Sequence, residues 1–222
     1  MSRVFDLLDI TKLGSTVISI ITALLCITIH ELAHGLVALK LGDTTARDRG
    51  RLTLNPIKHI DPVGFLMMVI FGFGWAKPVP VDMRNLRNPK RDMALVALAG
   101  PVSNMLLAVV FAILGGVALA IPVTNYTFHS TILDVVFRVM SMSIGLAVFN
   151  LIPLPPLDGS KILFSVLPDK AYARLMVIER YGSIILMVLL FSNVLDGVLA
   201  TVNTWVMTVL LWLMRLILVL LT

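Results

Sequence analysis

The chain has 222 residues, of which 58% are hydrophobic and only 14% are charged, with a formal net charge of +5. Soluble domains carry about 25% charged residues, so this composition excludes a soluble globular protein and predicts an α-helical polytopic membrane protein. The positive charge lies between apolar runs, which suits contact with an anionic leaflet and not with nucleic acid. A single cysteine, Cys26, excludes an internal disulfide.

The first apolar run, at about 14–41, predicts a membrane-spanning helix with the motif His-Glu-Leu-Ala-His in its second half. His30 and His34 are four residues apart, so on a helix both imidazoles lie on one face and can bind one metal ion. Glu31 directly follows the first histidine, where its carboxylate can take a proton from water at the metal. A solvated helix face is the alternative, but ionisable groups after an apolar run need partners. The motif therefore predicts a zinc site with Glu31 as general base.

A basic region at 44–82 separates the first span from the next. The alternating residues at 50–56, and the prolines at positions 78 and 80, favour short extended strands. The apolar stretch 62–75 is too short to span a bilayer and favours a re-entrant segment. A hairpin of short helices is the alternative. We therefore expect a re-entrant, short-strand region between the first two spans.

Four further apolar runs bring the number of expected long transmembrane helices to about five. They lie at about 93–121, 132–150, 181–195 and 198–221. The first of them contains Gly-Pro-Val-Ser-Asn at 100–104, in which Gly100 allows another helix to approach closely. Asn104 is a polar group inside the same span, and Pro101 leaves one helix carbonyl unpaired.

A proline-rich segment after the third span contains Asp158. Non-helical backbone is tolerated at membrane depth only when it is buried in protein or lines a wet cavity, and a carboxylate there needs a cation. Catalytic zinc usually takes three protein ligands, so Asp158 is the favoured third ligand; a turn-forming Asp-Gly is the alternative. Three other candidates fit less well: His59 lies in the basic loop, His129 on the opposite side, and Glu179 beside a cation.

The distribution of Lys and Arg predicts the orientation in the membrane. The stretches 42–92 and 160–180 are rich in both residues, whereas 122–131 contains neither. By the positive-inside rule the basic stretches are cytoplasmic. We therefore expect a multi-pass protein of the cell membrane with its active site nearer the cytoplasmic side.

Three motifs together resemble the signatures of the site-2 protease family of intramembrane zinc metalloproteases. They are His-Glu-Leu-Ala-His-Gly at 30–35, Gly-Pro-Val-Ser-Asn at 100–104, and Asn-Leu-Ile-Pro-Leu-Pro-Pro-Leu-Asp-Gly at 150–159. Their order and membrane placement also match. The absence of a PDZ or CBS domain resembles the compact prokaryotic branch. The resemblance implies one intramembrane metalloprotease domain over 1–222, with a catalytic core at 14–170 and accessory transmembrane helices at 171–222.

The same resemblance implies roles for individual residues. His30, His34 and Asp158 would bind one Zn²⁺ ion, and Glu31 would be the catalytic base. Asn150 would contact the substrate backbone or the reacting carbonyl, and Asn104 would support the core of the site.

The expected function is hydrolysis of peptide bonds in or near the transmembrane segment of membrane-protein substrates, as in regulated intramembrane proteolysis. The expected partners are a transmembrane protein or peptide and the lipid bilayer, with no nucleic acid. The alternatives are a membrane zinc-binding protein or transporter without protease activity, and an inactive protease-like scaffold. The later spans carry almost no histidine or acidic residues, which disfavours a transporter, and Glu31 would be superfluous in a scaffold.

Overall fold

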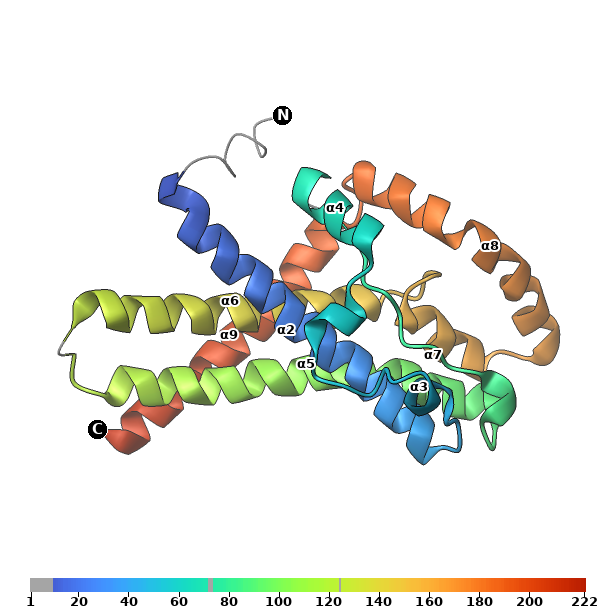
Figure 1. The fold of residues 1–222 in the computed structure, drawn as a ribbon, viewed down its shortest axis with the longest axis horizontal. Helices are drawn as coiled ribbons and strands as arrows, with labels where there is room; N and C mark the ends of the chain where they lie inside the picture. The colour runs from blue at the N-terminus through green and yellow to red at the C-terminus, as the bar shows by residue number, and fades with distance from the viewer. Residues whose placement is uncertain (1–9, 72–73, 124) are drawn as a thin grey trace.

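The computed structural model describes residues 10–71, 74–123 and 125–222, without the side chains of 10–13, 68–71 and 169–179. Five long helices account for most of this part of the chain (Figure 1). They are α2 (Ile10–Lys40), α5 (Pro89–Ala120), α6 (Tyr126–Asn150), α8 (Asp169–Phe191) and α9 (Asp196–Leu221). Four of these, α2 from Gly14 onward, α5, α6 and α9, are long and apolar enough to cross a membrane. The expectation of a helical polytopic membrane protein is therefore confirmed.

The span expected at about 181–195 is not among the four helices of spanning length. Within α8 the apolar helix whose side chains are described, Arg180–Phe191, is shorter than the about 20 residues that a span requires. The helix ends at Phe191, and Asn193 adopts a left-handed conformation with a φ of 56°. The described residues therefore support four spanning helices, one fewer than expected.

The region between α2 and α5 contains only short elements. They are α3 (Thr45–Asp48), the 3₁₀ helix η1 (Pro56–His59), α4 (Pro62–Phe71) and the 3₁₀ helix η2 (Met83–Asn85). The apolar stretch after position 62 is thus a helix of 10 residues, too short to span. Whether it enters the membrane stays a prediction.

The short strands expected in this region do not form among the described residues. What remains of strand pairing is one isolated antiparallel bridge between Ile60 and Ala76, with the Lys77 N–H donating to the His59 carbonyl at 2.9 Å. The predicted strand at 50–56 ends instead in a helical turn, because the Asn55 side chain accepts a hydrogen bond from the Ile57 N–H and starts η1.

Close packing of α5 against α6 and α9 forms the apolar core of the molecule. In Figure 1, α5 and α6 run antiparallel and α9 crosses them, while α2 crosses the same pair and contacts both. Small residues on α5 permit this approach: a Cβ added to Gly116 would lie 2.6 Å from the Ile217 Cβ of α9. The buried cluster consists of Ala108, Ala112, Val136, Met140, Ile144 and Leu210.

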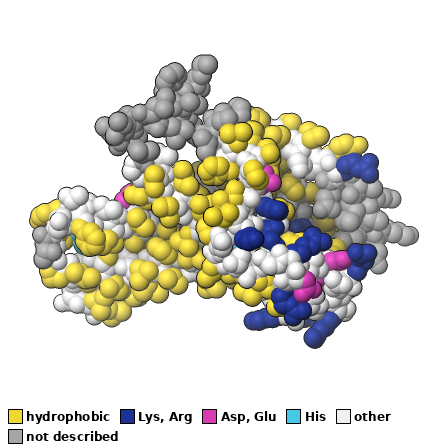
Figure 2. All heavy atoms as spheres, in the orientation of Figure 1, with side chains coloured by type: hydrophobic (Ala, Val, Ile, Leu, Met, Phe, Trp, Pro, Cys, Tyr) yellow, Lys and Arg dark blue, Asp and Glu magenta, His cyan; other side chains and the backbone are white. Residues whose placement is uncertain are grey.

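Charge is unevenly distributed over the face that Figure 2 shows. Lys and Arg side chains gather at the end where α3 and the start of α5 lie, whereas the opposite end is mainly hydrophobic. The face shown in Figure 2 therefore has one basic end and one hydrophobic end.

Candidate metal centre

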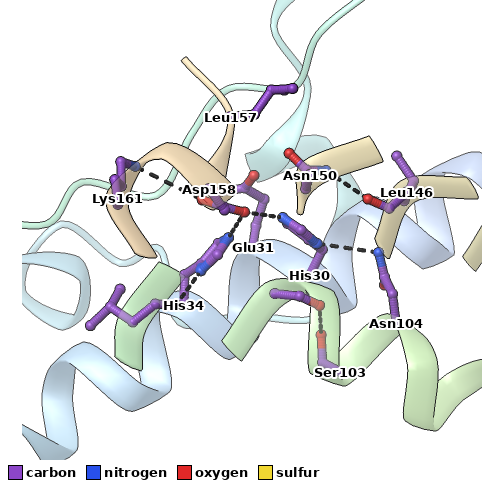
Figure 3. Close-up of polar contacts among 12 residues, drawn as sticks. His30, Glu31, His34, Ser103, Asn104, Leu146, Asn150, Leu157, Asp158 and Lys161 are labelled. Carbon is purple, nitrogen blue, oxygen red and sulfur yellow. Dashed lines mark hydrogen bonds and ion pairs between the residues drawn. The ribbon is translucent and has the colours of Figure 1, made fainter. Parts of the chain in front are cut away.

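Three side chains that are far apart in the sequence meet where α2, α5 and α7 (Asp158–Val166) come together (Figure 3). His30 and His34 lie on α2, and Asp158 is the first residue of α7. All three are buried, with exposed fractions of 6%, 8% and 7%. The Asp158 Oδ2 atom lies 3.1 Å from His30 Nε2 and 3.2 Å from His34 Nε2. Each residue offers one ligand atom within 4.8 Å of the other two.

These separations fit a tetrahedral zinc site. Zinc bonds of about 2.0 Å at tetrahedral angles place neighbouring ligand atoms about 3.3 Å apart, close to the separations of the two imidazole nitrogens from the carboxylate. The imidazole rings meet edge to face, with centroids 4.6 Å apart and an interplanar angle of 87°. Two nitrogens and one carboxylate oxygen are also the donor types that catalytic zinc takes.

The His34 ring is fixed by a backbone carbonyl of α5. Its Nδ1 atom lies 2.7 Å from the Val96 carbonyl oxygen, which can only accept a hydrogen bond. The proton of the neutral ring is therefore on Nδ1, and Nε2 presents a lone pair toward Asp158. This is the tautomer that binds a metal through Nε2.

The His30 ring is held by Asn104, also on α5. The amide Nδ2 of Asn104 lies 3.2 Å from His30 Nδ1, and Asn104 Oδ1 is buried without a partner among the described residues. Rotating the amide by 180° exchanges these two atoms without changing its shape. With Oδ1 toward the ring, His30 Nδ1–H donates to it and Nε2 is free for a metal. Asn104 therefore fits as the residue that orients the first histidine.

Gly100 is the point of closest approach between α5 and the two histidines. A Cβ atom at this position would lie 2.5 Å from His30 Cε1 and 2.5 Å from His34 Nε2. Such contacts are too short for any side chain, so both rings depend on glycine here. The close helix approach expected from Gly100 is confirmed, and the neighbour of Gly100 is the candidate metal centre.

Asp158 reaches the histidines because the chain folds back after α6. A Cβ added to Gly159 would lie 2.3 Å from the Leu151 carbonyl oxygen, so this return requires glycine. Asp158 was expected in extended backbone, but it begins α7, where a carboxylate is favoured by the helix dipole.

Glu31 faces the extended segment at 77–82. Its Oε2 atom accepts a hydrogen bond of 2.8 Å from the Val79 N–H. Because prolines occupy positions 78 and 80, Val79 supplies the one N–H in this stretch of three residues. The carboxylate of the expected base is thus oriented by backbone.

Both ends of the 77–82 segment are tied to the rest of the molecule. The Arg51 guanidinium donates to the Lys77 carbonyl at 2.7 Å, and the Asp82 N–H donates to the buried Asp43 carboxylate at 2.7 Å. Burial alone would raise the pKa of Asp43, but hydrogen bonds from Thr45, Asn85 and two backbone amides lower it. Asp43 therefore stays ionised and anchors the segment that contacts Glu31.

Among the described residues, His59 and His129 do not belong to the cluster, whereas Asn150 lies beside it (Figure 3). Asn150 ends α6, and its amide donates to the Leu146 carbonyl at 2.9 Å (Figure 3). His59 Nε2 contacts the Thr53 carbonyl at 2.9 Å, and His129 lies in the first turn of α6. The side chain of Glu179 lies outside the described residues.

Sequence reasoning missed three contacts of the site. The Val96 carbonyl and the Val79 N–H are backbone groups, which leave no signature in a sequence. Lys161 lies 3.9 Å from Asp158 Oδ1, and its spacing of three residues on a helix could have indicated it.

Fold and site together define a membrane protein with a buried centre of the His-Glu-x-x-His type, and comparison with known proteins identifies its family. Residues 115–195 match the model of Peptidase family M50. "Putative zinc metalloprotease YwhC" of Bacillus subtilis is 44% identical over 171 residues, which cover 77% of this chain and 78% of that protein. "Putative zinc metalloprotease Rip2" of Mycolicibacterium smegmatis is 29% identical over 192 residues, covering 84% and 71%. No solved structure matches the chain. The chain belongs to peptidase family M50, the site-2 protease family of zinc metalloproteases, as the sequence motifs led us to expect.

Proposed function

We propose that this M50 peptidase cleaves peptide bonds in or near the transmembrane segments of membrane proteins. The observation that carries the proposal is a buried cluster of His30, His34 and Asp158 with Glu31 beside it, on a helix of spanning length. From His30 to the end of α2 at Lys40 is about 15 Å at about 1.5 Å per residue. The centre therefore lies at a depth where a transmembrane substrate is accessible.

In this proposal His30, His34 and Asp158 hold one zinc ion. When bound, zinc supplies a Lewis acid that polarises the scissile carbonyl and lowers the pKa of water toward neutrality. Glu31 takes a proton from the attacking water and passes it to the leaving amine. The Val79 N–H keeps the Glu31 carboxylate aimed at the reaction site, and Lys161 holds the second oxygen of Asp158.

A transmembrane helix hides its amide bonds, so the substrate must be extended before it is cleaved. The 77–82 segment is extended backbone that contacts Glu31, and a substrate lying along it would be next to the base. Prolines limit its donors, so backbone carbonyls other than that of Lys77, which accepts from Arg51, would carry most of such pairing. Asn150, at the end of α6, is placed to contact that substrate in our proposal.

The basic end of the molecule supports an orientation in the cell membrane with the centre nearer the cytoplasm (Figure 2). The substrate class that suits this arrangement is a single-span membrane protein. A metal transporter is disfavoured, because within the described residues one cluster of metal-binding type is found and not a series along the spans.

The test uses the purified full chain in liposomes with a panel of tagged single-span membrane proteins. We expect zinc in the wild-type protein, cleavage within or next to the span, and loss of cleavage with a chelator. Glu31→Gln should retain zinc but lower turnover by about 10²–10⁴-fold, because it removes the base. Glu179→Gln, the same change at the only other glutamate, is the matched control and should stay active. Persistent turnover by Glu31→Gln would contradict the assigned base.

A further inference from the structure

An ion pair lies within the spanning helix α6, near the place where α2 crosses it (Figure 1). The Arg138 Nε–H donates to Asp134 Oδ2 at 2.7 Å, and the Arg138 Nη1–H donates to the Ser19 hydroxyl of α2 at 2.8 Å. Arg138 is twelve residues from each end of α6, which is about 18 Å along the axis. Charged side chains at such a depth almost always face the inside of a helix bundle or a water-filled cavity.

This ion pair is only partly covered by its own chain. The side chains of Arg138 and Asp134 have exposed fractions of 34% and 44%. A guanidinium has five N–H groups and a carboxylate about four acceptor positions. Within the described part of the chain two of the N–H groups and one acceptor position are used, which leaves about three of each. Ionic groups without partners are costly in lipid, so we expect another polar group to cover this pair.

The same face of α6 lets another helix approach closely. Successive spacings of four, three and four residues place Asp134, Arg138, Ser141 and Gly145 along one face of the helix, which we call the α6 stripe. Ser141 is exposed, and a Cβ added to Gly145 would have no neighbour within 4 Å. Small residues four apart are typical of close helix–helix contacts in membranes. The stripe therefore combines an incompletely paired ion pair with an open, small-residue surface.

The charges of the α6 stripe indicate which helix fits it. One cation and one anion give the stripe no net charge, and its unused donors and acceptors are about equal in number, so it is complementary to itself. A two-fold axis along the membrane normal brings the same face of two identical helices together at the same depth. Asp134 and Arg138 are then about 6 Å apart along the axis, within reach of the long Arg side chain. A partner helix with one added charge would leave net charge in the lipid, which is costly.

We propose that two copies of this chain associate in the membrane through the α6 stripe. Arg138 of each copy bonds to Asp134 of the other, and the small residues Ser141 and Gly145 let the two helices approach. The inference goes beyond the proposed function and does not depend on it, because the three candidate zinc ligands belong to one chain. Each copy therefore keeps its own metal centre.

The first test counts copies of the fluorescently labelled full chain in liposomes, by single-molecule photobleaching over a range of protein-to-lipid ratios. We expect the wild type to form pairs. Gly145→Leu places a large side chain in space that is open within one copy, so pairing should weaken by about tenfold or more. Gly197→Leu is the matched control, because Gly197 of α9 also has no neighbour within 4 Å of an added Cβ. It should pair as the wild type does, and circular dichroism checks the helix content of each variant.

Two results of this count would overturn the proposal. Wild-type copies that stay single at every ratio would exclude a second copy and assign the α6 stripe to a helix of another protein or to lipid. Wild-type pairs that Gly145→Leu leaves unchanged would place the contact on another face.

A charge exchange tests the ion pair itself. Asp134→Arg gives the stripe two cations, and Arg138→Asp gives it two anions, so each variant alone should pair about tenfold more weakly than the wild type. A mixture of the two variants with different fluorophores should form mixed pairs, because one supplies the cations and the other the anions. Mixed pairs no more frequent than pairs of one variant would overturn the exchanged ion pair. If either variant does not fold, the Gly145→Leu comparison decides alone.

Discussion

Both halves of α5 contain small residues that let another helix approach closely, but the groups that pack against them differ. In the first half, Gly100 admits the imidazole rings of α2, while the Val96 carbonyl and Asn104 bond to them. In the second half, Ala112 belongs to the apolar cluster with side chains of α6 and α9, and Gly116 lies against the Ile217 side chain and the Met214 backbone of α9. Small residues thus bring helices together in both halves, but only in the first half do polar groups of α5 bond to the side chains of the approaching helix. The comparison teaches that a small residue in a span marks function when buried polar groups lie within a turn of it.

Asp158→Ala should have the largest effect on the candidate metal centre, which lies beside the first half of α5. It removes one of three ligands, so we expect zinc content to fall from about one ion per chain to a small fraction of that. The measurement is metal analysis of the protein purified in detergent, with helix content checked by circular dichroism.

Asp134→Ala is the matched control for this change. Asp134 lies on the spanning helix α6, and its partner is Arg138 at 2.7 Å and not a histidine. This variant should retain zinc. If Asp158→Ala kept the wild-type stoichiometry, the third ligand would have to be sought elsewhere, and Glu179 would be the first residue to test.

Gly100→Ala should have the next largest effect. The added methyl group would overlap both histidine rings, with contacts of 2.5 Å, so the rings must move from the positions that face Asp158. We expect a loss of zinc affinity greater than the about 10–100-fold typical of losing a residue that only orients a ligand. Competition with a chelator measures it. Gly145→Ala is the control, because its Cβ would have nothing within 4 Å; equal affinity in the two variants would refute the steric explanation.

The sequence predicts the parts of this molecule that follow from local pattern. Long apolar runs located four spanning helices, and the spacing of His30 and His34 placed both rings on one face of a helix. The position of Asp158 could be inferred because a carboxylate among apolar residues needs a partner. These inferences depend on composition and spacing, which a single sequence carries in full.

The remaining features depend on neighbours that are distant in the sequence. The 50–56 pattern alternates as a strand would, yet Asn55 caps η1 and no partner strand with free donors is available among the described residues. Contacts of Glu31 with the Val79 N–H and of His34 with the Val96 carbonyl involve backbone, whose placement only the fold decides.

Changes at Asn104 test how the first half of α5 orients the proposed zinc ligand His30. Asn104→Leu keeps the size of the side chain but removes the partner of His30 Nδ1, so zinc affinity should fall by roughly 10–100-fold. Asn104→Asp retains an acceptor for Nδ1–H and should bind zinc more tightly than the Leu variant. The measurement is again chelator competition. Wild-type affinity in Asn104→Leu would show that the amide does not support the site.

Gly116→Ala should have the smallest effect on the metal, and it completes the comparison between the two halves of α5. The added methyl group would lie 2.6 Å from the Ile217 Cβ and 2.6 Å from the Met214 carbonyl oxygen, so α9 must shift. Overpacking of this kind costs about 1–3 kcal/mol, and thermal unfolding in detergent should occur at a lower temperature than in the wild type. Zinc content and cleavage of the accepted substrates should remain, because none of the three proposed ligands lies on α9. A Gly116→Ala variant that lost zinc as Gly100→Ala does would show that the two halves of α5 are coupled, and that packing of α9 is part of the catalytic machinery.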